Sequence, residues 1–176
     1  ESDAESQQPE RKFNQGQYDM LLRCSEKKDI TEWNEWREAN LLKDTNFSKE
    51  IWLEGANLEN AHLEGAELNG ACLGGAELRK VHLEGADLIQ AHFEGAHLYG
   101  AHLEGADLWE AHLEGANLFE AHLEGAQLRN AHLEGANLRH AYLEGANFEA
   151  ATVDGKTLIW YCDINRETFF TGVGLD

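Results

Sequence analysis

The sequence predicts an all-β solenoid preceded by an N-terminal α-helical cap, and three observations support this prediction. Residues 51–155 divide without a gap into twenty-one five-residue units. In almost every unit the first residue is Ala and the third is Leu or Phe, whereas the second and fourth residues are mostly polar. The segment before residue 51 lacks this period and has the pattern of amphipathic helices. Because self-similarity at a fixed period is the signature of repeat architectures, the five-residue period decides the fold class.

An α-helical arrangement of the repeats fails on geometry. Five residues advance a helix by about 500°, so successive leucines would drift by roughly 140° and form no apolar stripe. A short extended segment succeeds. In AHLEG at 101–105, alternation points the Ala and Leu side chains inward and the His and Glu side chains outward, and Gly turns the corner. Each unit is then one side of a coil, and neighbouring coils bury a shared column of leucines.

The units also follow the pattern A-(D/N)-L-x-x, as in ADLIQ at 86–90 and ANLFE at 116–120. Over about 105 residues this pattern resembles the pentapeptide repeat family. The resemblance implies a right-handed quadrilateral β-helix in which four units, or twenty residues, form one coil. About five coils would then stack at a strand spacing of ~4.8 Å. Residues twenty apart would therefore lie above one another on one face.

Four segments follow from these patterns. We expect a disordered tail at 1–13, a helical cap at 14–50, the β-helix at 51–155, and a C-terminal cap or the start of a further coil at 156–176. TLIWYCDIN breaks the period after 155, but Phe170 and Leu175 are again five residues apart. Because the period is still running at Asp176, we expect a fragment of a longer protein.

The helical cap has its own start signal. DITE at 29–32 resembles a capping box, and the EWNEWREAN segment that it opens reads as an amphipathic helix. Trp33 and Trp36 are spaced to lie on one face of this helix, against the first coil. We expect a further helix upstream, near residues 17–25.

The composition narrows the choice of partners and compartment. The chain has 33 acidic and 14 basic residues and a formal net charge of -19. This charge argues against direct contact with nucleic acid or an anionic membrane surface. No apolar run approaches the roughly 18 residues that a membrane helix needs. The three cysteines, Cys24, Cys72 and Cys162, are an odd set spread along the chain, which indicates reduced thiols and a cytoplasmic setting.

AHLEG-type units recur every ten residues, so they predict two opposite faces with columns of histidine. One column reads His62, His82, His102, His122 and Tyr142, and the other reads Trp52, Cys72, His92, His112 and His132. The glutamates beside them are Glu64, Glu84, Glu104, Glu124 and Glu144 on the first face and Glu94, Glu114 and Glu134 on the second.

Histidine and glutamate are zinc ligands, but a metal site is one dedicated cluster rather than an unbroken exposed column. We therefore favour a solvated, partly stacked ladder and expect no metal ion and no other cofactor. Acid–base catalysis is also not expected, because a convex rod offers no cleft that excludes water. Protonation of the histidines at mildly acidic pH would reduce the net negative charge, which predicts a change in solubility or self-association there.

The other two faces vary in sequence. Their outward columns read Glu59, Arg79, Tyr99, Phe119 and Arg139 on one face and Asn69, Ile89, Trp109, Arg129 and Glu149 on the opposite one. Stacking between coils, with cation–π contacts to the arginines, is the favoured interpretation of these aromatic residues. Exposed aromatic side chains also mark binding patches. The candidate partner-binding residues are therefore Trp109, Ile89, Tyr99 and Phe119.

These observations favour a non-enzymatic repeat scaffold that acts through contact with an unidentified protein partner, as a single protein or as a module of a larger one. The alternative is an acidic DNA mimic. Residues 56–150 hold 16 acidic and 4 basic residues, a charge density comparable to the one charge per ~1.7 Å of B-DNA. Some members of the family that the sequence resembles are DNA mimics that bind type II topoisomerases such as DNA gyrase and protect them from inhibitors. The members with that role generally have less uniform coils, often with a loop insertion or a dimerising C-terminal helix. This sequence has near-identical AHLEG copies and shows neither feature, so we rank this role second.

Overall fold

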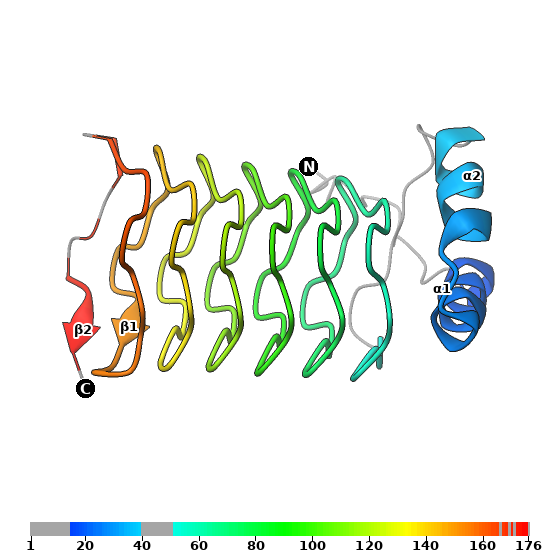
Figure 1. Cartoon of the computed structure of the whole chain (residues 1–176), viewed down its shortest axis with the longest axis horizontal. Helices are drawn as coiled ribbons and strands as arrows, with labels where there is room; N and C mark the ends of the chain where they lie inside the picture. The colour runs from blue at the N-terminus through cyan, green and yellow to red at the C-terminus, as the bar shows by residue number, and fades with distance from the viewer. Residues whose placement is uncertain (1–14, 40–50, 166, 169, 171, 176) are drawn as a thin grey trace, which may run out of the picture.

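The structure, a computed structural model, is a stack of coils with two helices at one end (Figure 1). It describes residues 15–39, 51–165, 167–168, 170 and 172–175. The predicted N-terminal helical part is confirmed: α1 spans Gln15–Lys27 and α2 spans Thr31–Ala39. The tail predicted to be disordered and the segment between α2 and the first coil lie outside the described residues. No helix in the described ranges is long and apolar enough to cross a bilayer.

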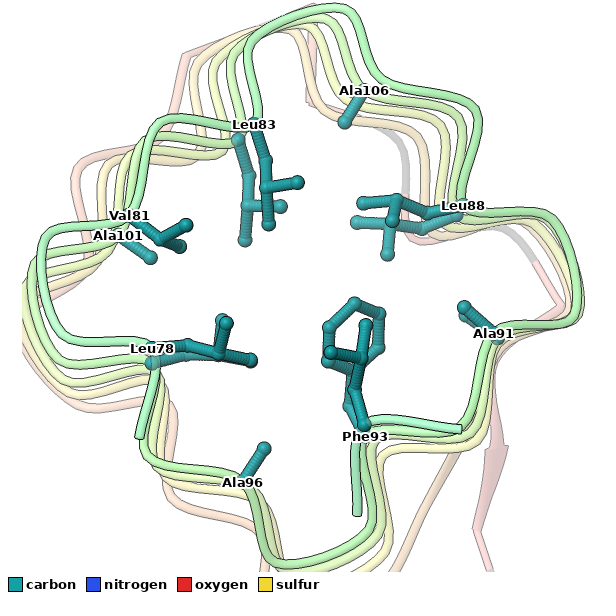
Figure 2. Close-up of a cluster of buried hydrophobic side chains, with 14 of the residues drawn as sticks. Leu78, Val81, Leu83, Leu88, Ala91, Phe93, Ala96, Ala101 and Ala106 are labelled. Carbon is teal, nitrogen blue, oxygen red and sulfur yellow. The ribbon is translucent and has the colours of Figure 1, made fainter. Parts of the chain in front are cut away.

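Parallel bridges join residues twenty apart and fix the size of the coil. The first four bridges start from the second residues of four successive units: Trp52 to Cys72, Asn57 to Glu77, His62 to His82 and Glu67 to Asp87. These four columns are the four sides of the coil, which Figure 2 shows in a view along the stack. The predicted twenty-residue coil with four sides is therefore present in the structure.

The extended segment in each unit is shorter than expected. Most bridges are isolated, and the named strands of the described chain are β1 (Thr152–Val153) and β2 (Gly174–Leu175), which pair in parallel. From residue 55 to residue 150, the fifth residue of every unit has a positive φ. A positive φ at this position alone, closed by a bond such as Ala56 N to Leu53 O at 3.0 Å, is the geometry of a type II turn. The fourth and fifth residues of each unit are therefore turn. Of the other three, only the second residue forms a bridge to the neighbouring coil.

The first and third residues of the units fill the interior, as predicted. Leu78, Leu83, Leu88 and Phe93 point toward the axis from four sides, with small residues such as Ala91 between them (Figure 2). All of these side chains are fully buried or nearly so. Burying one leucine contributes about 1.5–3 kcal/mol, so the stacked leucines are the main source of stability.

The two helices cover the N-terminal edge of the first coil. Trp33 is fully buried, and its indole Nε1 donates to the carbonyl of His62 at 2.7 Å. The Arg37 guanidinium donates to the carbonyl of Glu64 at 2.7 Å, and Asn34 accepts a hydrogen bond from the His62 amide at 3.0 Å. These contacts satisfy backbone groups that an uncovered edge would leave unpaired.

The predicted capping box is only half formed. Asp29 Oδ1 accepts from the Thr31 amide at 3.0 Å, as an N-terminal cap does. Glu32, however, pairs with Arg23 of α1 at 2.9 Å, and the Asp29 amide donates instead to the Cys24 carbonyl at 3.1 Å. Packing of α1 against α2 therefore replaces the reciprocal half of the box.

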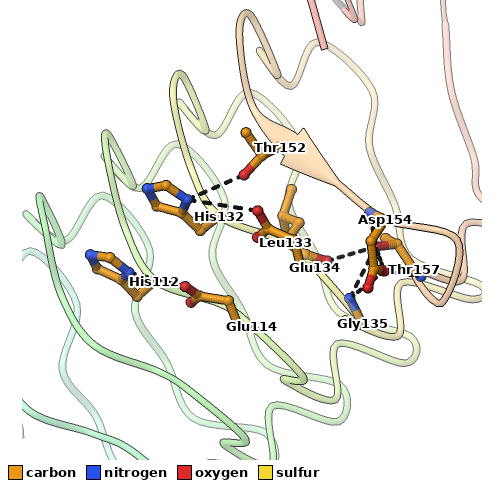
Figure 3. Close-up of polar contacts among 9 residues, drawn as sticks. All are labelled: His112, Glu114, His132, Leu133, Glu134, Gly135, Thr152, Asp154 and Thr157. Carbon is orange, nitrogen blue, oxygen red and sulfur yellow. Dashed lines mark hydrogen bonds and ion pairs between the residues drawn. The ribbon is translucent and has the colours of Figure 1, made fainter. Parts of the chain in front are cut away.

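Beyond residue 155 the ladder continues with a shifted register. Leu158 pairs with Asn137 and Asp163 pairs with Tyr142, each twenty-one residues apart, so one residue is inserted here. Asp154 accommodates the insertion, because its Oδ1 accepts from the Gly135 amide at 2.8 Å, while Thr157 Oγ1 donates to the Leu133 carbonyl at 2.8 Å (Figure 3).

The same side-chain pattern recurs eleven residues later. Asn165 Oδ1 accepts from the Gly145 amide at 3.2 Å, and Thr168 Oγ1 donates to the Leu143 carbonyl at 2.8 Å. The break in TLIWYCDIN is therefore a local insertion within the coil. The three cysteines are all free of disulfides.

Candidate functional site

Two opposite sides of the coil carry the predicted histidine columns. We call the column that starts at His62 the first histidine column and the one that includes His92, His112 and His132 the second. Rings stack within both: His82 on His102 at 4.7 Å between ring centroids and 4° between planes, and His92 on His112 at 4.7 Å and 1°. The predicted stacked ladder is present, although His62 and His82 are tilted by 33°.

The stacked histidines are held by the glutamate of their own unit, except His132, whose Nδ1 lies 3.2 Å from Thr152 Oγ1 and 3.9 Å from Glu134. The distance from Nδ1 to Oε1 is 2.9 Å between His92 and Glu94, and it is 3.2 Å between His112 and Glu114. Because a carboxylate only accepts hydrogen bonds, the Nδ1 atom must carry the proton. The neutral ring then has a bare Nε2 on its far edge. Figure 3 shows this orientation for His112, which turns one ring nitrogen toward Glu114 and the other away from it.

The hydrogen bond from His92 favours the charged form of Glu94. Burial alone would raise the pKa of Glu94, but the hydrogen bonds that it accepts, first from His92, outweigh this effect, so the pKa of Glu94 lies below its ordinary value. Further buried carboxylate oxygens have no hydrogen-bond partner within the described part of the chain. They are the Oε2 atoms of Glu84, Glu104, Glu114, Glu124, Glu134 and Glu144.

A shallow depression of about 280 Å³ lies beside the second histidine column. It is lined by Gly70, Gln90, His92, Glu110, His112 and His132. The side-chain amide of Gln90 donates through Nε2 to Glu110 Oε2 at 2.8 Å, which fixes this carboxylate at the rim. The sequence prediction missed Glu110 and Gln90, because as fifth residues of their units they were assigned only to the turn.

The other two sides, which we call the variable faces, use the second residue differently. Where it is Asn or Asp, its Oδ1 accepts from the amide of the fourth residue: Trp109 to Asp107 at 3.2 Å and Phe119 to Asn117 at 3.3 Å. This side chain thus satisfies a turn amide that histidine, with a protonated Nδ1, cannot satisfy. The motif A-(D/N)-L encodes this bond.

Tyr99 and Phe119 lie on one variable face and engage each other. Their rings stack at 5.8 Å between centroids, the Tyr99 hydroxyl donates to Glu120 at 2.8 Å, and the Arg139 guanidinium lies 5.7 Å from the centre of the Phe119 ring. The predicted contacts between coils are therefore formed. Both side chains are half-buried.

Ile89 and Trp109 lie on the opposite variable face, so the four candidate residues do not form one site. The backbone amide of Gln90 donates to the Trp109 carbonyl at 2.9 Å, which places Ile89 and Trp109 on adjacent coils. Trp109 is 39% exposed, and with Asp107, Gln127 and Arg129 it lines a shallow depression of about 340 Å³. Arg129 is held by Glu149 at 3.2 Å.

A four-sided coil of twenty residues with an interior of leucine and alanine defines a class of protein, the quadrilateral β-solenoid. The model of the pentapeptide repeats family matches this chain in eight copies, over residues 50–79, 76–115, 96–135 and 116–155. The chain therefore belongs to the pentapeptide repeat family. The right-handed quadrilateral β-helix is the fold of that family.

Solved structures of other family members are similar to this chain. HetL, a protein of the cyanobacterium Nostoc sp. strain PCC 7120 involved in heterocyst differentiation regulation, is 29% identical; the match covers 75% of this chain and 70% of HetL, with a TM-score of 0.45. Rfr23 of the cyanobacterium Cyanothece 51142 is 27% identical, with 81% and 97% covered and a TM-score of 0.47. QnrB1, a plasmid-mediated fluoroquinolone resistance protein, is 19% identical, with 74% and 72% covered and a TM-score of 0.49. A search of curated protein sequences gave no match.

Proposed function

We propose that this protein is a non-enzymatic scaffold that binds a protein partner through the variable face that carries Trp109. Pentapeptide repeat proteins are in general structural or interaction proteins rather than enzymes. The observation that carries the proposal is the exposure of Trp109 beside a polar depression on a rigid frame. Tryptophan and arginine are enriched among the residues that dominate binding energy at protein interfaces. The cytoplasmic setting and self-association at mildly acidic pH remain predictions.

The chemistry around Trp109 suggests the kind of partner. Asp107 lines the depression beside Trp109, and the chain as a whole is strongly acidic. A partner that places an apolar group against the indole and basic groups around it would complement this surface. Tyr99 and Phe119 support the proposal less, because their rings stack on each other and the Tyr99 hydroxyl is bonded to Glu120 within the protein.

The test is affinity capture from cells of the source organism, followed by titration of the captured protein against variants. Trp109→Ala should weaken binding by about thirtyfold, as expected for a residue that dominates an interface. Trp52→Ala is the matched control, since Trp52 is 65% exposed but lies on a histidine face. Equal affinities of wild type and Trp109→Ala would contradict the proposal.

A second candidate function is DNA mimicry toward a type II topoisomerase such as DNA gyrase. The observation that favours it is the array of carboxylates, which repeats at every coil from Glu64 to Glu144 on the first histidine face and from Glu94 to Glu134 on the second. Several of their buried oxygens have no partner in the described chain. A gyrase supercoiling assay tests it. If micromolar protein neither inhibits supercoiling nor protects gyrase from a fluoroquinolone, this function is excluded.

A further inference from the structure

We propose that the second histidine column forms a zinc-binding site in which His92, His112 and Glu110 hold one Zn²⁺ ion. This site is independent of the proposed partner surface. The sequence favoured a solvated ladder because it showed neither where the ring nitrogens point nor what lies beside them. The structure supplies both.

The imidazole orientation suits metal binding. Glu94 and Glu114 accept the Nδ1 protons of His92 and His112, so each Nε2 atom presents a lone pair. Histidines that bind metal almost always donate their other ring N–H to such a partner, which fixes the tautomer and raises the basicity of the ligand nitrogen. The glutamates therefore prepare the histidines as ligands.

The depression beside the column supplies the third ligand and the space. Its lining includes Gln90 and Glu110, which precede the histidines, but not Glu94 or Glu114, which follow them. Since the Nδ1 edges face the following glutamates, the Nε2 edges lie on the side of the depression. Glu110 stands on that side and is held through Oε2 by Gln90, which leaves Oε1 for an ion.

The distances allow an ion to be shared between two coils. The rings of His92 and His112 stack with 4.7 Å between their centroids and 1° between their planes, and both residues line the depression from adjacent coils. Two ligands on a tetrahedral zinc ion, each at about 2.1 Å, are roughly 3.4 Å apart. Because the two ring planes are nearly parallel, their Nε2 lone pairs also run parallel, so both rings must leave the stack and tilt toward each other to bind one ion. Both side chains are partly exposed, so rotation about their side-chain torsions can supply this change.

The charge and the ligand types favour a zinc-like ion. Glu94, Glu110 and Glu114 surround two neutral imidazoles, so a divalent cation would reduce local repulsion. Two imidazole nitrogens and one carboxylate are a known zinc set, with water in the fourth position. Magnesium and calcium prefer sites made of oxygen alone and should not compete.

The first histidine column is a built-in control. It has the same stacked histidines and glutamates, but its preceding turns offer Lys80 and Gly100 where the second column has Gln90 and Glu110. The Lys80 side chain lies over Gly100, with Cγ 3.6 Å from where a Cβ atom would stand. The first column therefore has a positively charged residue and a glycine where the second column has an amide and a carboxylate, and this disfavours a cation there.

The experiment is calorimetric titration of the intact chain with Zn²⁺ at neutral pH, with Co²⁺ absorption as a second readout of nitrogen coordination. Wild type should bind one tight equivalent that excess Mg²⁺ does not displace. His112→Gln and Glu110→Gln should each weaken binding by about tenfold or more. His102→Gln in the first column should leave it unchanged, and unchanged circular dichroism should verify folding of each variant.

Three outcomes would overturn the proposal. They are no tight binding by wild type, a loss in His102→Gln as large as in His112→Gln, and full binding by His112→Gln. A zinc-dependent rise of the melting temperature checks the result without calorimetry, because a ligand that binds only the folded state stabilises it. That rise should be present in wild type and His102→Gln and absent from His112→Gln.

Discussion

The histidine faces and the variable faces share one frame and differ in what the second residue of each unit does. On a histidine face, His112 reaches outward to the side chain of Glu114, and the turn ends in glycine. On a variable face, Asn117 turns inward to the amide of Phe119, and the turn ends in Glu120 at a positive φ of 56°. One face thus organises side chains at the surface, whereas the other stabilises the turn itself.

The interior should not distinguish the two kinds of face. Leu113 of a histidine face and Leu118 of a variable face are both fully buried in the same stack. Leu113→Ala and Leu118→Ala should therefore each lower the free energy of unfolding by about 2–5 kcal/mol, the cost of a cavity in a packed core. Urea denaturation of both variants measures this. Costs that differ by more than about 1.5 kcal/mol, half the spread of such substitutions, would show that the frame is not shared.

The turns should respond in opposite directions. Gly115 has a φ of 67°, and a Cβ atom there would meet nothing within 4 Å, so Gly115→Ala changes only the backbone strain. We expect it to cost about 1 kcal/mol. Ala150 of a variable face has a φ of 55°, so Ala150→Gly should relieve strain and gain about 0.5 kcal/mol after the entropy of glycine is subtracted.

Both turn variants are measured by the same denaturation curves. A gain from Gly115→Ala, or a loss from Ala150→Gly as large as 1 kcal/mol, would contradict this account of the turns.

The second residue should matter more on a variable face. Asn117→Ala removes the acceptor for the Phe119 amide and for the Asn137 side chain, which should cost about 0.5–1.5 kcal/mol. His122→Ala removes a pair at the surface with Glu124, for which less than about 1 kcal/mol is expected, and the stacking of its ring on His102 and Tyr142. Asn117→Asp is the control, because Asp107 makes the same bond, and it should restore most of the loss. A larger cost for His122→Ala would reverse the comparison.

The pH dependence of Glu94 is the smallest effect that we expect. Its folded-state pKa lies below its ordinary value of 4.5, so this carboxylate stabilises the fold above that pH and loses the contribution as the pH falls through the folded pKa. The urea midpoint for unfolding of wild type should therefore decrease when the pH is lowered below about 4.5. The midpoint of Glu94→Gln should decrease less over the same range. Parallel curves for the two proteins would show that the bond from His92 does not lower the pKa.

Much of this molecule could be predicted from its sequence, because each repeat tests the same assignment again. The coil length, the inward Ala and Leu and the membership of each column all follow from period and alternation. The inserted residue near Lys156 could not be predicted, since the tie from Asp154 to Gly135 joins positions nineteen apart that the repeat pattern does not pair. The role of Glu110 was also missed, because it depends on which way an imidazole turns, and a one-letter sequence does not carry that information.

The central claim is that glutamates fix His82, His92, His102 and His112 with the proton on Nδ1 and Nε2 bare. Nitrogen-15 NMR of labelled histidine at neutral pH measures this directly, because protonated and bare ring nitrogens have well-separated chemical shifts. We predict the Nδ1–H tautomer for His82, His92, His102 and His112. His97, outside both columns, is the internal reference, since the 3.9 Å between its Nε2 and a Glu77 oxygen is too long for a hydrogen bond that would fix its tautomer. The Nε2–H tautomer throughout both columns would contradict the account.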